Sequence, residues 1–140
     1  MKRFFAFTTM LLISILFGSC GLFYRNDPAP PPYLPNRTEI TSVRVSSYPN
    51  MTLLSSSEEI DFVLAILFNA TPTKIESVND TPNAEDLYGI QILAGESSTL
   101  FYLYKRERYL GLVTQWYIEQ PYRGIYEISE EDANSLLNLL

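Results

Sequence analysis

The chain has 140 residues, with 10 basic and 16 acidic side chains, no histidine and one cysteine. The acidic balance argues against a nucleic-acid-binding protein, which needs a basic footprint. The lack of histidine argues against Ser-His-Asp and Cys-His catalysis and against the usual zinc sites. A single cysteine cannot form an internal disulfide, so stability has to come from packing of the many aromatic and aliphatic side chains. Composition therefore predicts a protein that is not an enzyme and that holds no metal or cofactor.

The N-terminal segment has the organisation of an export signal. A basic pair at positions 2–3 is followed by an uncharged, largely apolar run over residues 4–17, and then by Gly18, Ser19 and Cys20. A basic start, an apolar run and small residues at the end are typical of a secretory signal. The run has about 14 residues, whereas a helix needs about 20 to span a bilayer, so a permanent transmembrane helix is disfavoured.

This segment resembles the signal peptide of bacterial lipoproteins, in which a small residue precedes a cysteine that receives a diacylglycerol. Gly18, Ser19 and Cys20 match that pattern, whereas Phe17 stands where leucine is most usual. The resemblance implies cleavage after residue 19 and acylation of Cys20 with fatty acids such as palmitate. It also implies a lipid anchor on the outer face of the cytoplasmic membrane in a Gram-positive cell, or in the outer membrane of a Gram-negative cell, which Gly21 would permit. The alternative is an ordinary secretory signal with an incidental cysteine.

Three segments are therefore expected: a signal peptide at 1–19, a lipidated cysteine with a tether at 20–38, and a single domain at 39–140. The tether contains the proline-dense run 27–35, which favours extended polyproline II and a semi-rigid spacer. The alternative for this run is a ligand for a proline-recognising groove. Loss of the signal leaves 8 basic and 16 acidic side chains, so electrostatic adhesion to anionic lipid is disfavoured.

Residues 40–47 are β-branched and partly alternating, which predicts a strand ended by Pro49-Asn50, with a short extended lead-in at 52–54. Two serines then precede two glutamates by three residues, as in a capping box, and apolar side chains follow at helical spacing. These signals predict a helix over about 57–69. Residues 71–87 are predicted to form an acidic loop, whose carboxylates lack the regular spacing of a calcium site.

Four further strands are predicted from alternating or β-branched patterns, over residues 88–94, 99–105, 109–118 and 125–128. Ser129, with an acid three residues later, begins a second helix over about 130–139. Consecutive strands with short links favour an antiparallel sheet. The predicted fold class is α+β, with a sheet of about four to five strands and two helices packed on one face.

The charged residues offer two weaker candidates for chemistry. Acidic side chains gather over residues 127–132, and paired carboxylates could serve a glycosidase. Three of them fall in the first turn of the second helix, where acids favour the helix dipole. Basic side chains gather over 105–108, where they suit either an anionic ligand or a soluble strand turn.

Aromatic side chains give the stronger candidate. The strands predicted over 99–105 and 109–118 are apolar on both faces, and two helices are too few to cover both. One face would then expose rings that suit contact with a glycan or a protein. The alternative is packing in the core or against the loop 71–87. The candidate partner surface consists of Tyr102, Tyr104, Trp116, Tyr117 and Tyr122.

The order of elements over about residues 40–140 is similar to that of small domains without an assigned role in lipoproteins of Gram-positive bacteria. The residues that carry this resemblance are Ser57-Glu58-Glu59-Ile60 and Tyr126-Glu127-Ile128-Ser129. It implies a non-catalytic extracytoplasmic module. We therefore expect a membrane-anchored lipoprotein of the cell envelope that binds an envelope protein or glycan. The alternatives are a structural or accessory subunit of an envelope assembly and, more remotely, a hydrolase that uses carboxylates alone.

Overall fold

The computed structural model describes residues 27–77, 80–108 and 113–140. The predicted signal peptide, Cys20 and the start of the tether lie outside the described residues, as do the first four residues of the strand predicted at 109–118. None of the helices in the described part of the chain is long and apolar enough to cross a membrane.

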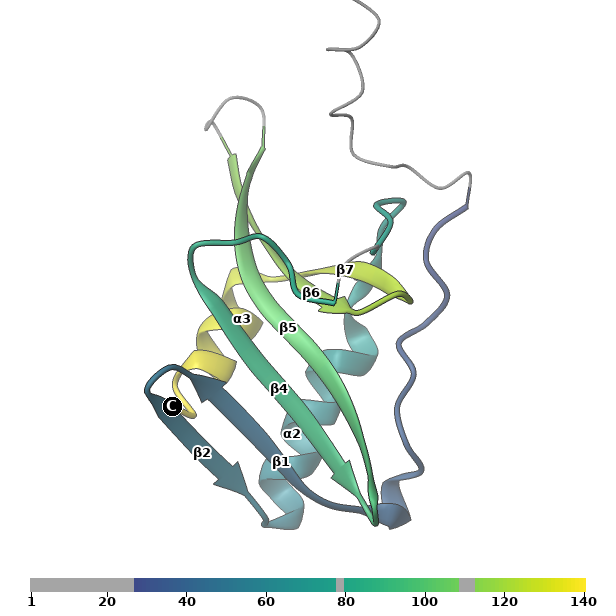
Figure 1. The fold of residues 1–140 in the computed structure, drawn as a ribbon, viewed down its shortest axis with the longest axis vertical. Coiled ribbons are helices and arrows are strands. Elements are labelled where there is room, and N and C mark those ends of the chain that lie inside the picture. The colour runs from purple at the N-terminus through teal and green to yellow at the C-terminus, as the bar shows by residue number, and fades with distance from the viewer. Residues whose placement is uncertain (1–26, 78–79, 109–112) are drawn as a thin grey trace, which may run out of the picture.

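One antiparallel sheet of seven strands dominates the structure, in the spatial order β2-β1-β4-β5-β6-β7-β3 (Figure 1). The strands are β1 (Ile40–Ser47), β2 (Asn50–Leu54), β3 (Thr71–Pro72), β4 (Leu87–Ala94), β5 (Ser97–Arg108), β6 (Val113–Gln120) and β7 (Gly124–Ile128). The helices are the 3₁₀ turn η1 (Arg37–Glu39), α2 (Ser57–Asn69) and α3 (Glu130–Leu137).

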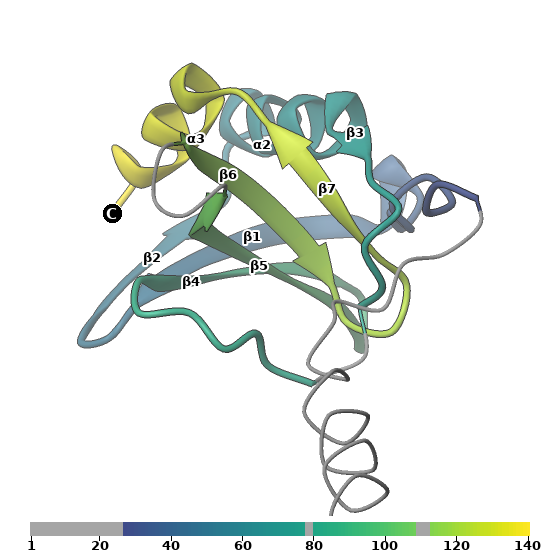
Figure 2. The ribbon, with the colours of Figure 1, turned by 90° about the horizontal axis from the view of Figure 1, so that it is seen from above.

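The predicted fold is wrong. The expectation was an α+β arrangement with four to five strands and two helices packed on one face, whereas the structure is mostly a seven-strand antiparallel sheet with two short helices. The sheet is also not a flat layer under the helices. Figure 2 shows that it bends, with β6 and β7 turned out of the plane of β1, β4 and β5. Strand twist accumulates across a sheet of this width and produces such curvature.

The prediction missed β3 and described β2 only as a short extended lead-in at 52–54, and these two strands contain or follow a proline. Pro49-Asn50 was expected to end the first strand, and β1 does end at Ser47, but Tyr48-Pro49 is also a two-residue link across which Ser47 pairs with Asn50. Thr71-Pro72 was expected only to follow the helix, but it pairs with β7 at the edge of the sheet, where a missing N–H is tolerated. A proline alone therefore does not show whether a segment is a loop, a hairpin link or an edge strand. The pairing with a neighbouring strand decides this.

Two serines begin the helices, and both interactions that define a capping box are present at the first. The Ser56 hydroxyl accepts a hydrogen bond from the Glu59 N–H, and the Glu59 carboxylate accepts one from the Ser56 N–H. At α3, the Ser129 hydroxyl accepts from the Asp132 N–H. Such a cap contributes about 1 kcal/mol, because it satisfies backbone donors that the first turn leaves unpaired.

The core consists of two clusters, one on each side of the sheet. The larger joins the helices to the sheet through residues such as Val63, Phe101 and Leu136, all fully buried. The smaller contains Tyr104 and Tyr117 together with residues of the 73–87 segment and β7. The described residues 73–77 and 80–86, which we call the cover segment, therefore lie over β5, β6 and β7 on the side of the sheet opposite Phe101.

The described part of the predicted tether is not a free spacer, because residues 28–35, which we call the strap, lie against the domain. The Ala29 N–H donates to the Thr73 carbonyl at 2.8 Å, and the Tyr126 hydroxyl donates to the Pro30 carbonyl at 2.8 Å. The Arg123 Nε donates to the Pro31 carbonyl at 2.9 Å. Figure 1 shows the strap running alongside the body of the domain.

A glycine makes room for the strap. A Cβ atom added to Gly124 would lie 2.4 Å from the Ala29 Cβ and 3.1 Å from the Tyr126 hydroxyl oxygen. Ala29 is buried at this contact. The close approach of the two backbones thus requires the absence of a side chain at position 124.

We expect Gly124→Ala to lower the free energy of unfolding by about 1–3 kcal/mol, because the added methyl group overpacks the strap contact. Urea denaturation of the purified protein measures this change. Ala29→Gly in the same chain should recover more than half of the loss, since it removes the atom that clashes. A Gly124→Ala variant that Ala29→Gly does not rescue would show that the strap contact is not the cause.

Candidate functional site

Three of the five predicted surface aromatics are buried, which confirms for these three the alternative of packing in the core or against the loop 71–87 and corrects the candidate surface. Tyr104, Trp116 and Tyr117 have exposed fractions of 4%, 5% and 1%. The cover segment buries Tyr104 and Tyr117, and Trp116 belongs to the larger core. Tyr102 is half-buried, whereas Tyr122 is 65% exposed. Only the last two can therefore offer a ring surface to a partner.

A buried carboxylate that the sequence analysis did not single out organises this side of the sheet. Glu119 of β6 is 3% exposed, and its two oxygens accept hydrogen bonds from the Ser77 hydroxyl at 2.6 Å and the Tyr104 hydroxyl at 2.9 Å. A buried charge is costly unless it is paired or hydrogen-bonded, so these two donors make the arrangement tenable. An acid at the end of the apolar run 116–118 was the available sequence signal.

The turn between β6 and β7 is attached to the same network. The Ser77 hydroxyl accepts a hydrogen bond from the Tyr122 N–H at 3.0 Å. Tyr122 has a φ of 59°, in the left-handed region that non-glycine residues rarely adopt. A hydrogen bond to the Asp80 side chain raises the pKa of Tyr122. Ser77 and Asp80 therefore hold both the backbone and the side chain of this exposed tyrosine.

A second polar side chain of β6 binds the backbone of a tyrosine in the strap. The Gln120 Oε1 accepts from the Tyr33 N–H at 2.8 Å, and the Gln120 Nε2 donates to the Tyr33 carbonyl at 3.1 Å. The Arg123 guanidinium lies 5.8 Å from the centroid of the Tyr33 ring. Tyr33 is 56% exposed, so this amide pair holds the backbone while the ring stays accessible.

These elements line a shallow, open depression of about 570 Å³, which we call the aromatic groove. It is lined by Tyr33, Asp80–Thr81, Ser98–Leu100, Tyr102 and Gln120–Pro121. The Thr81 hydroxyl lies 3.4 Å from the Tyr102 hydroxyl. The strap, the cover segment and strands β5 and β6 all contribute, so the groove exists only when these separate parts of the chain are assembled. It combines flat apolar surface with hydroxyl, amide and carboxylate groups.

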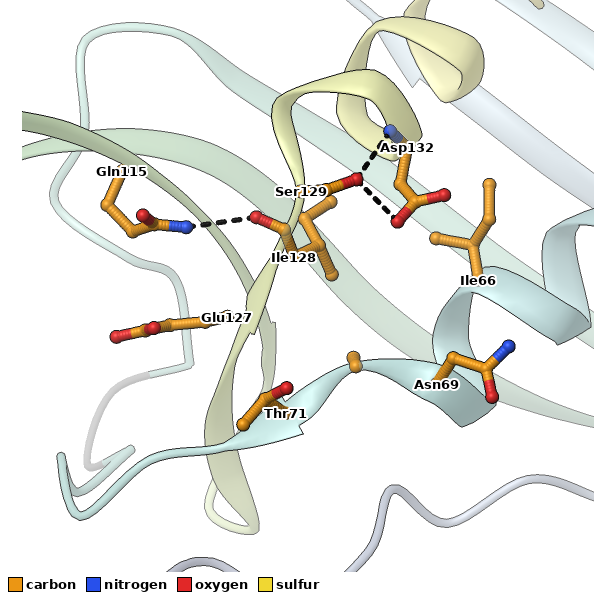
Figure 3. Close-up of a pocket in the computed structure, with 9 residues that line it drawn as sticks. Ile66, Asn69, Thr71, Gln115, Glu127, Ile128, Ser129 and Asp132 are labelled. Atoms are coloured by element: carbon orange, nitrogen blue, oxygen red, sulfur yellow. Dashed lines mark hydrogen bonds between the residues drawn. The ribbon is translucent and has the colours of Figure 1, made fainter.

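A second hollow, of about 320 Å³, lies between the end of α2, β3, β7 and the start of α3 (Figure 3). Three of its polar side chains are engaged within the protein: the Ser129 hydroxyl donates to the Asp132 carboxylate, and the Gln115 Nε2 donates to the Ile128 carbonyl. Glu127 and Asp132 point away from each other in Figure 3, so they do not form a facing carboxylate pair. Asp132 therefore takes part in the cap of α3, while Glu127 belongs to β7.

Among the described residues, no three or more acidic or thiol side chains lie together in a way that could hold a metal ion. The basic residues Lys105 and Arg106 lie within β5 and not at a turn. Lys105 places its ammonium group 4.6 Å from the centroid of the Trp116 ring. The Lys105 charge thus makes a cation–π contact within the protein.

Comparison with known proteins gives one family and one solved structure. The model of the DUF5301 family, described as "Domain of unknown function (DUF5300)", matches residues 29–127, which is more than half of the chain and includes most of the strap. The chain is also similar to the NMR structure of a protein from Ruminococcus gnavus, with 28% sequence identity and a TM-score of 0.59. That similarity covers 72% of this chain and 97% of the other. No curated protein matches the chain.

The Tyr104–Glu119 contact predicts a loss of stability in alkali. Burial, and then the charge of Glu119, raise the pKa of Tyr104 above its ordinary value. The folded protein therefore holds this proton more tightly than the unfolded chain, in which tyrosine has a pKa of about 10. The resulting stabilisation is fully present below about pH 10 and is lost as the pH rises above it.

We expect Tyr104→Phe to lower the free energy of unfolding at neutral pH by about 1–3 kcal/mol, because Glu119 loses one of its donors. The same variant should lose less stability than the wild type between about pH 9.5 and 11. Urea denaturation at a series of pH values measures both effects. Parallel pH profiles for the two proteins would contradict the role assigned to Tyr104, since every other tyrosine is common to both.

Proposed function

The chain belongs to the DUF5301 family, and we propose that it is a lipid-anchored, non-catalytic lipoprotein of the cell envelope that binds an uncharged glycan in the aromatic groove. The observation that carries this proposal is the meeting of Tyr33 from the strap with Tyr102 from β5 across a hollow with polar walls. Tyr102 belongs to the surface expected from the sequence, and Tyr33 adds a ring that the sequence analysis placed in a spacer.

The chemistry of the groove matches that of a sugar chain. A pyranose ring has apolar C–H faces and a rim of hydroxyl groups. The rings of Tyr33 and Tyr102 provide apolar surface for the faces, while Asp80, Thr81 and Ser98 provide acceptors and donors for the rim. Small-molecule sites commonly combine apolar walls with a few placed polar groups in this way.

The charge of the protein favours an uncharged polymer. The part of the chain after the signal has 8 basic and 16 acidic side chains, so a polyanion approaching it meets net repulsion. Asp80 adds a carboxylate inside the groove itself. A neutral polysaccharide avoids this cost and can still donate hydroxyl hydrogens to Asp80.

The walls of the groove are held before any ligand arrives. Gln120 makes two hydrogen bonds to the backbone of Tyr33, and Glu119 connects the cover segment to the sheet through Ser77. Groups that are already ordered lose little conformational entropy on binding, which strengthens weak contacts such as ring stacking.

The proposed anchor sets the position of the groove in the envelope. Tyr33 lies 13 residues after Cys20. A chain of that length spans at most about 45 Å, so an acylated Cys20 would keep the groove close to the membrane surface. Two or three acyl chains would make the attachment stable, because each buried methylene contributes about 0.8 kcal/mol. The ligand is then a glycan that reaches the layer next to the membrane.

We expect Tyr102→Ala and Tyr33→Ala each to weaken binding to an insoluble, uncharged polymer of N-acetylglucosamine about tenfold, since losing one stacked ring costs about 1.4 kcal/mol. Co-sedimentation at increasing protein concentration measures the affinity. The matched control is Tyr48→Ala, which removes a fully exposed tyrosine at the β1–β2 turn and should leave binding unchanged. Equal effects of all three substitutions, or no binding by the wild type, would refute the proposal.

The anchor has its own test. Cys20→Ser should abolish metabolic labelling by a fatty-acid analogue and release the protein from the membrane fraction. Ser19→Ala should leave labelling intact, because alanine is also small. Labelling that persists in Cys20→Ser would show that the lipid is not on this residue, and it would leave the glycan proposal to be judged on its binding data.

A further inference from the structure

The two edges of the sheet differ in how they are protected from other strands. At one edge, β3 has two residues and contains Pro72, which cannot donate a hydrogen bond. At the other edge, β2 has five residues, pairs with β1 without a register shift and contains no proline or charged side chain. Short strands, prolines and charges are the usual means by which proteins block edge-to-edge pairing. The β2 edge lacks all three.

The register of the hairpin decides which backbone groups face outward. In an antiparallel hairpin with a two-residue link, the pair that flanks the link is hydrogen-bonded, and such pairs then alternate along the ladder. Here Ser47 and Asn50 flank the link. Asn50, Thr52 and Leu54 therefore direct their backbone groups toward β1. The N–H and C=O groups of Met51 and Leu53 point away from it, to the free edge.

The side chains of the same two residues are exposed. Met51 is 63% exposed and Leu53 is 56% exposed, whereas Leu54 is buried in the core. Among the residues that the structure describes, no strand lies beyond β2 (Figure 1). Two outward donors, two outward acceptors and two exposed apolar side chains thus coincide on one strand.

We propose that β2 pairs with β2 of a second copy of this chain, antiparallel and centred on Thr52. In this register Met51 of one copy is opposite Leu53 of the other, and the outward backbone groups form four hydrogen bonds. The exposed methionine and leucine side chains of both copies then meet on one face of a continuous sheet. A two-fold axis through Thr52 makes the contact self-complementary, so it closes as a dimer.

Charge favours a second copy over a foreign strand. Residues 48–57 contain no charged side chain, so a partner selected by its charge finds nothing to pair with there. The exposed Met51 and Leu53 side chains need apolar side chains opposite them. The same two residues of a second copy supply these. β-strand addition uses backbone hydrogen bonds for affinity and alternate side chains for specificity.

Cysteine crosslinking tests the register. Directly opposed residues in a non-hydrogen-bonded pair have Cα atoms about 4.5 Å apart, which is within disulfide range. In the proposed register Thr52 is opposite Thr52 of the second copy. Thr52→Cys should therefore form a disulfide dimer when cells that express the full chain are treated with a thiol oxidant. Met51→Cys or Leu53→Cys alone should give at least about tenfold less dimer, because equivalent positions are then diagonal and about 7–8 Å apart. Coexpression of Met51→Cys with Leu53→Cys should restore the dimer. The wild type is the control, because any disulfide dimer that it forms must come from Cys20.

A second pair of substitutions separates pairing from folding. Leu53→Pro removes an outward N–H and leaves the hydrogen bonds to β1 intact, and Leu53→Lys adds a charge to the edge. Each, placed in the Thr52→Cys chain, should abolish the disulfide dimer at an unchanged protein level. Absence of the Thr52→Cys dimer, equal dimer at positions 51, 52 and 53, or dimer that survives both Leu53 substitutions would overturn the proposal.

Discussion

The buried carboxylate of Glu119 is the constraint on which one side of this molecule depends. A charged group with an exposed fraction of 3% needs donors, and Ser77 and Tyr104 supply them. Because the Ser77 hydroxyl also accepts from the Tyr122 N–H, one side chain of β6 connects β5, the cover segment and the β6–β7 turn. The cover segment has no helix or long strand of its own over residues 73–77. Its position therefore rests on side-chain hydrogen bonds and on the small cluster around Tyr104 and Tyr117.

The next residue along β6 extends this arrangement to the strap. Gln120 binds both backbone groups of Tyr33, and the Ala29–Gly124 contact brings the strap against the turn. Two consecutive polar side chains of one strand thus position two separate walls of the aromatic groove. This explains why the groove combines residues that are far apart in the sequence, and why the family match extends into a proline-rich segment. It also gives the groove a physical connection to the segment that leads toward Cys20.

The features that sequence reasoning could predict are those decided by near neighbours. The capping serine at position 56 has its partner three residues away, and the α2 periodicity is complete within one helix. The features that it missed depend on distant residues. Ser77 and Glu119 are 42 residues apart, and Gln120 and Tyr33 are 87 apart. Gly124 is informative only beside Ala29, and the extended segment at 52–54 is recognisable as part of a hairpin only once Asn50 is seen opposite Ser47. The candidate aromatic surface was chosen by residue type, and the cover segment, which the sequence presented as an acidic loop, buries part of it.

The central claim is that the aromatic groove is a binding site for an uncharged glycan. Backbone amide NMR of the isotope-labelled protein during titration with soluble, uncharged oligosaccharides of N-acetylglucosamine tests it most directly, since each amide reports on its own surroundings. The account predicts saturable shifts at Tyr33, Thr81, Leu100, Tyr102 and Tyr122, and unchanged signals at Met51 and Leu53 on the edge strand β2. Shifts that are absent, or that gather outside the groove while its amides stay unchanged, would contradict it.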